Sequence, residues 1–296
     1  MRSQVVQERV ESEVSRVFRE RKTPAEIAAL LPRFWVDGES ASLIPVTDRG
    51  FLYGDGVFET IRVCYANLPL WAWHRRRLHE SCLRLDLPVD LSALEQQLFC
   101  LVKDFDAAVV KAIVTRGDGR RGYNPSGAPG RVVVGLHPLP ELPEGAMQEG
   151  VCVRCCRTRL GHCPALAGMK HMGRLEQVMA RAEWQDNTHF EGLLFDVDDW
   201  LVSGTMSNVF LVKSGVLYTP DLSLSGVRGV MRQWILDNLG ACEKRLGYRD
   251  LEEADEVFLT NSVVGVVPVS RCSDVCWSTG PVTRNIQERW ARLIAP

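Results

Sequence analysis

The sequence of 296 residues lacks a strong excess of charge of either sign, and it lacks any apolar run long enough to span a membrane. The formal net charge is −2, from 35 basic and 37 acidic side chains, so the electrostatic footprint of a nucleic-acid-binding protein is missing. Residues 1–9 contain no apolar core of a signal peptide. We therefore expect a protein that works neither on nucleic acid nor in a membrane.

Metal-binding patterns are also scarce. Cys152 and Cys155 have the spacing of a CxxC motif, but no second CxxC accompanies them. Residues three apart in a strand face opposite sides of the sheet, so a zinc site is not expected. We interpret all ten cysteines as reduced thiols. This interpretation predicts a cytoplasmic protein without a bound metal.

No internal repeat or low-complexity tract divides the chain, so its organisation is inferred from periodicity and from proline and glycine. Valines at helical spacing among charged residues predict a helical N-terminal extension over residues 1–34. Residues 35–136 predict a smaller α+β domain, the proline-rich residues 137–145 a linker, and residues 146–296 a larger α+β domain. Strands and helices come in blocks, which indicates the α+β class.

One lysine stands between a glycine and a predicted helix. Lys170 follows Gly168, and Leu175, Val178 and Met179 then recur at helical spacing. At such a junction a helix N-terminus, a neighbouring cation or desolvation would lower the pKa of the ammonium group. A lysine of that kind is the nucleophile that Schiff-base chemistry needs. A solvated surface lysine is the alternative, and it is the commoner case.

Candidate anion sites lie elsewhere in the chain. Ser225-Gly-Val-Arg-Gly229 opens a predicted helix, and free N–H groups at a helix N-terminus bind anions. Thr260 and Asn261 end a predicted strand with small polar side chains that could contact the same anion. Arg77 lies three residues after His74 on a predicted helix and is expected to turn inward. A capped helix, a strand-end turn and a solvated helix face are the respective alternatives.

Arginine and glycine are concentrated in the segment Arg116-Gly-Asp-Gly-Arg-Arg-Gly-Tyr123. Arg116 and Arg121 are candidates for binding carboxylates through their guanidinium groups. A flexible basic loop is the alternative. An amine nucleophile, a phosphate-binding turn and carboxylate-binding arginines together predict a pyridoxal-phosphate enzyme that acts on an anionic amino compound.

Short motifs occur in an order that narrows this prediction. They are Asp48-Arg49, Tyr53-Gly-Asp-Gly56, Phe58-Glu-Thr60, His74-x-x-Arg77, Ser207-Asn-Val-Phe210, Gly226-Val-Arg-Gly229, Arg116 to Tyr123, Lys170-His171, Arg174-Leu-Glu-Gln177 and Met231-Arg-Gln233. From about Trp35 onward the sequence resembles the fold-type IV pyridoxal-phosphate enzymes. Within that group it is most similar to the 4-amino-4-deoxychorismate lyases of folate biosynthesis.

The resemblance implies a two-domain fold with the cofactor between the domains, in a homodimer. It implies conversion of 4-amino-4-deoxychorismate to 4-aminobenzoate and pyruvate. Lys170 would hold pyridoxal 5'-phosphate as a Schiff base and move protons. The other implied cofactor contacts are Arg77 and the Val227 and Arg228 N–H groups at the phosphate, with Ser203, Asn208, Thr260 and Asn261. Tyr53, Arg116 and Arg121 are the candidates for contacting substrate.

Ser203 departs from the family pattern. Five residues before the asparagine of the Ser-Asn-Val-Phe motif, this group usually carries an acid that pairs with the pyridine nitrogen, and the sequence has serine there. A carboxylate keeps the ring protonated, whereas a hydroxyl only hydrogen-bonds a largely neutral ring. Transamination depends more on a protonated ring than elimination does, so Ser203 favours a lyase. A D-amino-acid or branched-chain-type aminotransferase and a catalytically weakened homologue stay open as alternatives.

Overall fold

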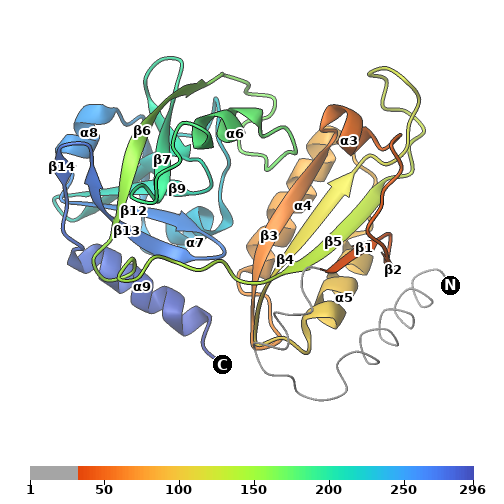
Figure 1. Cartoon of the computed structure of the whole chain (residues 1–296), viewed down its shortest axis with the longest axis horizontal. Coiled ribbons are helices and arrows are strands. Elements are labelled where there is room, and N and C mark those ends of the chain that lie inside the picture. Colours follow the sequence, from red (N-terminus) through yellow and green to blue (C-terminus); the bar gives the residue numbers. More distant parts are fainter. Residues whose placement is uncertain (1–32) are drawn as a thin grey trace. The chain divides into compact units, whose positions relative to one another are not determined.

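The computed structural model describes residues 33–296 and divides into two compact units (Figure 1). Of the described residues, unit 1 holds 33–139, 170–173 and 294–296, and unit 2 holds 140–169 and 174–293. The predicted N-terminal extension, except for its last two residues, lies outside the described part of the chain. The first boundary, after residue 139, falls within the segment that the sequence predicts as a linker.

Unit 1 is built on a five-stranded antiparallel sheet with the strand order β2-β1-β5-β4-β3. Its strands are β1 (Arg33–Val36), β2 (Glu39–Ser40), β3 (Gly56–Cys64), β4 (Ala107–Thr115) and β5 (Arg131–His137). Its helices are α3 (Arg49–Tyr53), α4 (Trp71–Leu85) and α5 (Leu91–Val102).

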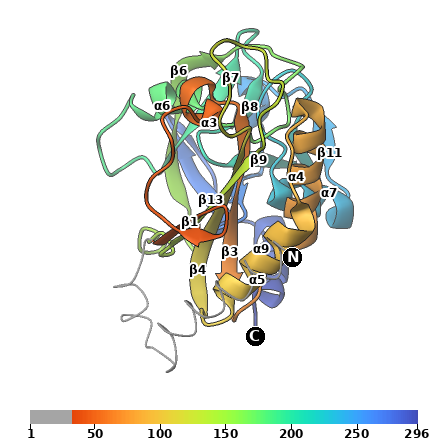
Figure 2. The same cartoon turned by 90° about the vertical axis from the view of Figure 1, so that its right-hand side faces the viewer.

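The core of unit 1 lies between the sheet and helices α4 and α5, which Figure 2 shows along the sheet. Leu78 of α4, Leu98 of α5 and Ile61 of β3 belong to this core, and all three are almost fully buried. Burying each such side chain contributes about 1.5–3 kcal/mol. The apolar residues of α4 and α5 recur on one face of each helix, and this face is the buried one.

Unit 2 contains a longer mixed sheet with the order β11-β10-β9-β12-β13-β6-β7-β8, and β14 pairs with β13. Its strands are β6 (Val151–Leu160), β7 (Glu191–Asp196), β8 (Leu201–Gly204), β9 (Asn208–Lys213), β10 (Val216–Pro220), β11 (Cys242–Lys244), β12 (Glu256–Asn261), β13 (Gly265–Cys272) and β14 (Val275–Cys276). Its helices are α6 (Leu175–Arg181), α7 (Val230–Leu239), α8 (Tyr248–Glu252) and α9 (Pro281–Leu293).

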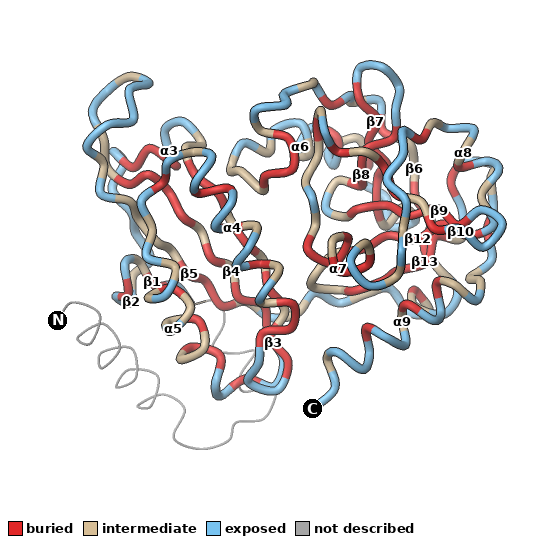
Figure 3. The backbone as a smooth tube through the Cα atoms, turned by 180° about the vertical axis from the view of Figure 1, so that it is seen from behind, coloured by how far each residue is buried: buried red, intermediate tan, exposed pale blue. Residues whose placement is uncertain are grey.

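Several strands of unit 2 are buried on both faces. Strands β7, β8 and β12 carry only buried or half-buried residues, and Figure 3 shows them as buried segments. Such continuously buried strands need cover on both sides of the sheet. The predicted α+β class is confirmed by this combination of two mixed sheet-and-helix units. Within residues 33–296, every helix is too short or too polar to cross a membrane.

Candidate active site

Lys170 lies in an extended segment that joins the edge of the sheet in unit 1. The N–H of Phe58 donates to the Lys170 carbonyl over 2.9 Å, and the N–H of Met172 donates to the Gly56 carbonyl over 2.9 Å. His171 forms an antiparallel bridge with Val57. Residues 170–173 therefore belong to unit 1, whereas the sequence assigns the lysine to the larger C-terminal domain.

Lys170 precedes a helix, as the spacing predicts, but helix α6 begins only at Leu175, five residues later. The expected influence of a helix N-terminus on the ammonium group stays a prediction. The apolar stripe of this helix is also exposed: the exposed fractions are 76% for Leu175, 61% for Val178 and 62% for Met179. Helical spacing identified the helix, but spacing does not tell whether its apolar face is covered.

The Lys170 ammonium group lies over an aromatic ring. Its Nζ is 4.5 Å from the ring centroid of Phe58, within the range of a cation–π interaction. Phe58 lies on β3 directly before Glu59, whose side chain points to the other face of the sheet. The base of the lysine is fixed by two backbone hydrogen bonds and its tip by a ring, so its amine has a defined position.

Arg77 is held by a buried carboxylate. Its Nε donates to Oε1 of Glu59 over 2.8 Å, and its Nη2 donates to Oε2 over 2.5 Å. Burial raises the pKa of Glu59, but the charge of Arg77 and the hydrogen bond from His74 outweigh it and lower the pKa to about 2. Glu59 is therefore ionised, and the predicted inward turn of Arg77 is found.

His74 completes this cluster on helix α4. Its Nδ1 lies 2.6 Å from Oε2 of Glu59, and its side chain is fully buried. Burial lowers the pKa of His74, and the positive charges of Arg77 and Lys170 lower it further, against the raising effect of Glu59. The ring is neutral, so Nδ1–H donates to the carboxylate. The influence of Lys170 on this pKa indicates that its ammonium group is close to the cluster.

Arg116 has a structural role in the folded chain, which contradicts its assignment to the substrate carboxylates. Its Nε donates to Asp55 over 2.8 Å, and its Nη1 and Nη2 donate to the carbonyls of Asp86 and Leu85. Only 6% of the residue is exposed. All three guanidinium nitrogens have partners within unit 1, so Arg116 ties β4 to the end of α4.

Arg121 and Tyr53 lie at a loop that a second arginine anchors. The Arg49 guanidinium donates to Asp55 and to the carbonyls of Gly122 and Tyr123. The Gly122 N–H donates to the Tyr53 hydroxyl over 3.2 Å. Arg121 is exposed. The assignment of Arg121 and Tyr53 to substrate binding stays a prediction.

The glycine-rich turn before α7 lies in unit 2 and pairs with the segment before Lys170. The N–H of Gly168 donates to the Gly226 carbonyl, and the side-chain amide of Asn208 donates to the Val227 carbonyl over 2.9 Å. Gly168 and Gly226 have φ values of 84° and 83°, which L residues rarely adopt. Asn208 thus fixes the shape of the predicted phosphate-binding turn.

One predicted donor of this turn is already used. The N–H of Arg228 donates to the Gly168 carbonyl over 3.0 Å, so it is not available to a phosphate group as predicted. The Val227 N–H has no such bond to Gly168, because the bridge between them is parallel and uses the neighbouring N–H groups. The prediction for the Val227 N–H therefore stays untested, and that for the Arg228 N–H is not supported.

Thr260 carries a buried hydroxyl group without a partner. Its Oγ1 makes no hydrogen bond among the residues that the structure describes, although only 1% of the residue is exposed. Thr260 pairs with Asn208 in the register of β12 and β9. Buried polar groups normally have partners, and an orphaned one indicates a missing ligand, ion or water. This hydroxyl lies beside the Asn208 side chain that fixes the Val227 turn.

Asn261 stabilises the turn that follows β12. Its Oδ1 accepts hydrogen bonds from the N–H groups of Val263 and Val264, both over 2.9 Å. The side-chain carbonyl of Asn261 is therefore used by the turn. A contact of its side-chain NH2 group or its backbone with the cofactor stays a prediction.

Ser203 is buried on β8, and its Oγ donates to the Gly204 carbonyl over 2.8 Å. A carboxylate lies nearby: Glu191 accepts hydrogen bonds from residues 205–207, including the Ser207 hydroxyl over 2.9 Å. Glu191 also accepts from its neighbour Gly192, so its oxygens are fully occupied by this turn. It cannot serve as a substitute for an acid at position 203 without breaking the turn.

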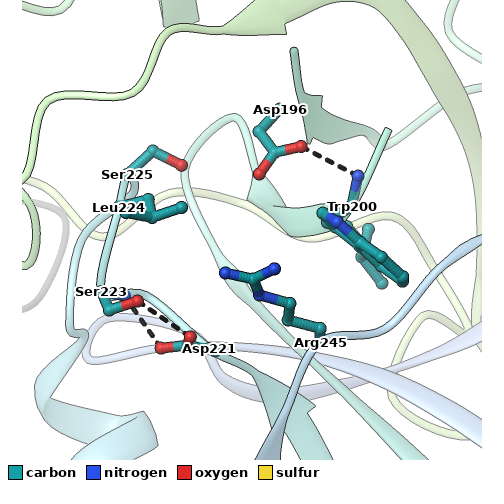
Figure 4. A pocket seen from close by; sticks show the side chains of 8 residues that line it. Asp196, Trp200, Asp221, Ser223, Leu224, Ser225 and Arg245 are labelled. Atoms are coloured by element: carbon teal, nitrogen blue, oxygen red, sulfur yellow. Dashed lines mark hydrogen bonds between the residues drawn. The ribbon is translucent and has the colours of Figure 1, made fainter. Parts of the chain in front are cut away.

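Unit 2 also contains a small pocket (Figure 4). It is lined by Asp196, Trp200, Leu201, Asp221, Ser223, Leu224, Ser225 and Arg245. The Ser223 hydroxyl donates to Asp221, and Asp196 accepts from the Trp200 N–H. Among the residues of the predicted sites, only Ser225, at the start of the predicted anion-binding segment, lines this pocket. In the described chain, no three His, Cys, Asp or Glu side chains gather in a way that would hold a metal ion.

The sequence and the fold are similar to those of known proteins. The profile of the amino-transferase class IV family matches residues 56–272. The chain belongs to this family. The aminodeoxychorismate lyase of Vibrio harveyi is 37% identical over 271 residues, which cover 86% of this chain and 98% of that relative. The crystal structure of 4-amino-4-deoxychorismate lyase from Pseudomonas aeruginosa has a TM-score of 0.85 at 43% identity, covering 88% of this chain and 98% of that one.

Aminotransferases of the class IV family are also similar. The branched-chain amino acid aminotransferase of Escherichia coli has a TM-score of 0.77 at 25% identity and covers 89% of this chain and 94% of that chain. The D-alanine aminotransferase of Bacillus licheniformis is 29% identical over 265 residues, 84% of this chain and 90% of the relative.

Sequence reasoning missed three contributors to this class IV site. It did not assign roles to Glu59, to His74 or to the ring of Phe58, although two of its motifs contain them. The sequence did contain a signal for Glu59. This acid alternates with the apolar Val57 and Ile61 on one face of a strand, and that face is buried. A buried acid on a strand requires a cation, and Arg77 at helical spacing from His74 supplies it.

Proposed function

We propose that this chain is a pyridoxal-phosphate-dependent lyase that converts 4-amino-4-deoxychorismate to 4-aminobenzoate and pyruvate. The observation that carries the proposal is the match to the Vibrio harveyi lyase, which extends over 98% of that enzyme. The solved lyase from Pseudomonas aeruginosa supports it with a TM-score of 0.85. The cofactor, pyridoxal 5'-phosphate, agrees with membership of the class IV family.

The residues present fit this cofactor. In unit 1, Lys170 supplies the amine, and the Arg77 guanidinium is fixed by Glu59 for a phosphate contact. In unit 2, the unpartnered Thr260 hydroxyl is a donor that a phosphate oxygen would satisfy. The Val227 N–H lies in the turn that Asn208 holds. When bound, the cofactor withdraws electrons from the carbon that carries the substrate amine.

Lys170 is the base in this proposal. Its Nζ takes the proton from the amine-bearing ring carbon, and departure of the enolpyruvyl oxygen then leaves an aromatic ring. The Phe58 ring beneath the amine keeps it in place and excludes water from one side. The ionised Glu59, which also meets His74, keeps the Arg77 guanidinium group oriented.

Ser203 supports elimination over transamination. Its hydroxyl carries no charge, so it does not hold the pyridine nitrogen protonated as a carboxylate would. Aromatisation of the substrate ring provides a driving force that transamination lacks. The aminotransferase alternative keeps support from the branched-chain and D-alanine aminotransferases that are similar to this chain.

A direct assay separates these functions. The purified protein is incubated with 4-amino-4-deoxychorismate, and 4-aminobenzoate and pyruvate are measured by fluorescence and by lactate dehydrogenase coupling. A lyase releases both in equal amounts. A second incubation supplies D-alanine or L-leucine with 2-oxoglutarate. Glutamate formation there, without 4-aminobenzoate in the first assay, would favour the aminotransferase and refute the lyase.

We also propose that the protein is a cytoplasmic homodimer. The exposed Leu175, Val178 and Met179 of α6 support a second copy as a partner, because a contiguous apolar stripe rarely faces water. All ten cysteines are free thiols in the folded chain, which supports a reducing compartment. Sedimentation equilibrium tests the dimer, and a species of 33.2 kDa at micromolar concentration would contradict it.

A further inference from the structure

Lys111 shares one face of a sheet with the residues that hold the amine of Lys170. It lies on β4, where it pairs with Thr60 of β3 and with Gly135 of β5. Phe58 is two residues from Thr60, so the side chains of Phe58 and Lys111 stand on the same face. This is the face opposite to the one on which Glu59 meets α4.

The Phe58 ring contacts two ammonium groups. Nζ of Lys111 lies 4.9 Å from the ring centroid, and Nζ of Lys170 lies 4.5 Å from it. Two positive charges at one ring repel each other, and the negative face of the ring only partly offsets this. Both groups are within reach of a single small molecule that carries more than one negative charge.

Lys111 is half-buried and has no carboxylate partner within residues 33–296. The other buried cations of this unit differ in this respect. Arg77 pairs with Glu59, Arg116 with Asp55, and Arg131 with Asp48 and Asp118. A partly desolvated positive charge without a counter-charge is unfavourable, so a bound anion would stabilise the Lys111 ammonium group.

The neighbouring side chains do not supply that counter-charge. His137 pairs with Val109 on the same sheet, two positions along β4 from Lys111. Burial lowers the pKa of His137, and the charge of Lys111 lowers it further, so this ring is neutral at pH 7. Phe34 packs edge-on against it with a centroid distance of 5.4 Å. His137 and Phe34 are therefore aromatic neighbours that supply no negative charge to Lys111.

We propose that Lys111 binds a carboxylate of the substrate beside the Phe58 ring. The inference rests on the proposed function, whose substrate carries two carboxylates, and it deepens that function by assigning one of them a receptor. Lys111 takes the place of Arg116 as the proposed carboxylate-binding residue, because the guanidinium group of Arg116 is fully used inside unit 1. A lysine suits this role because a single ammonium group binds a carboxylate without a fixed approach angle.

Binding of chorismate tests the proposal without depending on turnover. Chorismate has the same two carboxylates and a hydroxyl group in place of the amine, and its affinity for the holoenzyme is measured by calorimetry. Lys111→Met is expected to weaken binding by about tenfold or more, the loss of one charge-assisted contact. Lys111→Arg is expected to restore most of the affinity. Lys103→Met, at an exposed position after α5, is the control and is expected to bind like wild type.

Steady-state kinetics with 4-amino-4-deoxychorismate provide a second readout. Lys111→Met is expected to raise KM at least fivefold, to change kcat less than threefold, and to leave the absorbance band of the bound cofactor unchanged. A merely structural role would instead lower the amount of folded, cofactor-loaded protein. If Lys111→Met does not fold, Lys111→Gln and Lys111→Arg give the same comparison.

Two outcomes would overturn the proposal. One is equal chorismate affinity in Lys111→Met and wild type, or no binding by wild type. The other is a shifted pH profile of the absorbance band with unchanged chorismate affinity, which would make Lys111 a modulator of Lys170. Failure of the proposed function is distinct from both, since it appears as absent 4-aminobenzoate release by the wild-type enzyme.

Discussion

Glu59 and Arg77 form a two-point ion pair across the interface of β3 and α4, with hydrogen bonds of 2.8 and 2.5 Å. Only 2% of the Glu59 side chain and 12% of the Arg77 side chain are exposed. The pair fixes the arginine that we propose for the cofactor phosphate. The Glu59 carboxylate also meets Nδ1 of His74, so one buried carboxylate positions two side chains of helix α4.

Glu59→Gln is predicted to destabilise the protein by about 3 kcal/mol, because it leaves the positive charge of Arg77 buried without a counter-charge. Urea unfolding measures the change. Glu253→Gln removes an exposed pair with Lys213 and serves as the control, with a change below about 0.5 kcal/mol. Equal effects in the two variants would contradict the importance of the buried pair.

The same pair predicts a pH dependence of stability. The pKa of Glu59 falls from its ordinary value of 4.5 to about 2 on folding. A lowered pKa stabilises the folded state above the unfolded value, and this contribution is lost as pH falls from 4.5 toward 2. Wild type should lose stability over that range more steeply than Glu59→Gln. Parallel curves of unfolding free energy against pH would count against the assignment.

Thr260→Val tests the orphaned hydroxyl in unit 2. The substitution removes a group that has no partner in the folded chain, so the apoprotein should be as stable as wild type or slightly more stable. Cofactor affinity should fall about fivefold to tenfold, equivalent to a lost hydrogen bond of about 1–1.5 kcal/mol. Fluorescence titration of apoprotein with pyridoxal phosphate measures it.

Thr219→Val is the matched control for this experiment. Thr219 is also a buried threonine on a strand of unit 2, but its hydroxyl donates to the Val209 carbonyl over 2.9 Å. Its loss should lower stability and leave cofactor affinity unchanged. If Thr260→Val behaved in this way instead, the hydroxyl would have a structural partner and no role in phosphate binding.

Ser203→Glu is predicted to shift the absorbance band of the bound cofactor and the pH at which the band changes, because a carboxylate favours the protonated ring. Glutamate-forming side activity should rise. Absorbance spectra between pH 5 and 9 are the measurement, with Ser40→Glu, at an exposed strand position, as the control for added charge. Ser203→Asp is the smaller alternative for this buried position. Identical spectra in all variants would show that residue 203 does not meet the ring.

Arg116→Met and Arg121→Met separate structure from binding in one loop. Arg116→Met removes a buried partner of Asp55 and should destabilise the protein by about 3 kcal/mol. Arg121→Met changes an exposed side chain, so stability should stay within about 0.5 kcal/mol while KM for the anionic substrate rises severalfold. A large stability loss in Arg121→Met with unchanged KM would remove it from the substrate site.

Local patterns predicted the elements and some of the site. The spacing of His74 and Arg77 on one helix indicated an inward arginine, and the fold places that arginine on Glu59. Glycines at positions 226 and 229 indicated the turn before α7, and Gly226 has the positive φ that only glycine adopts easily. These signals succeed because they depend on residues within one or two helical turns of each other.

Long-range partners could not be predicted in the same way. The sequence presents Arg116 as a substrate ligand, because nothing local shows that Asp55 and the carbonyls of Leu85 and Asp86 use its guanidinium group. The sequence indicates only a loop before a helix at Lys170, because it does not show that residues 170–172 pair with β3. Both cases involve contacts between segments distant in sequence, which only the folded chain brings together.

The central claim is that the amine of Lys170 holds the cofactor. Reduction of the holoenzyme with sodium borohydride, followed by digestion and peptide mass analysis, tests it most directly. We predict a phosphopyridoxyl group on the peptide with Lys170 and its absence from Lys170→Ala, which should also lose the absorbance band and release of pyruvate. The group on another lysine, or undiminished pyruvate release by Lys170→Ala, would contradict the account.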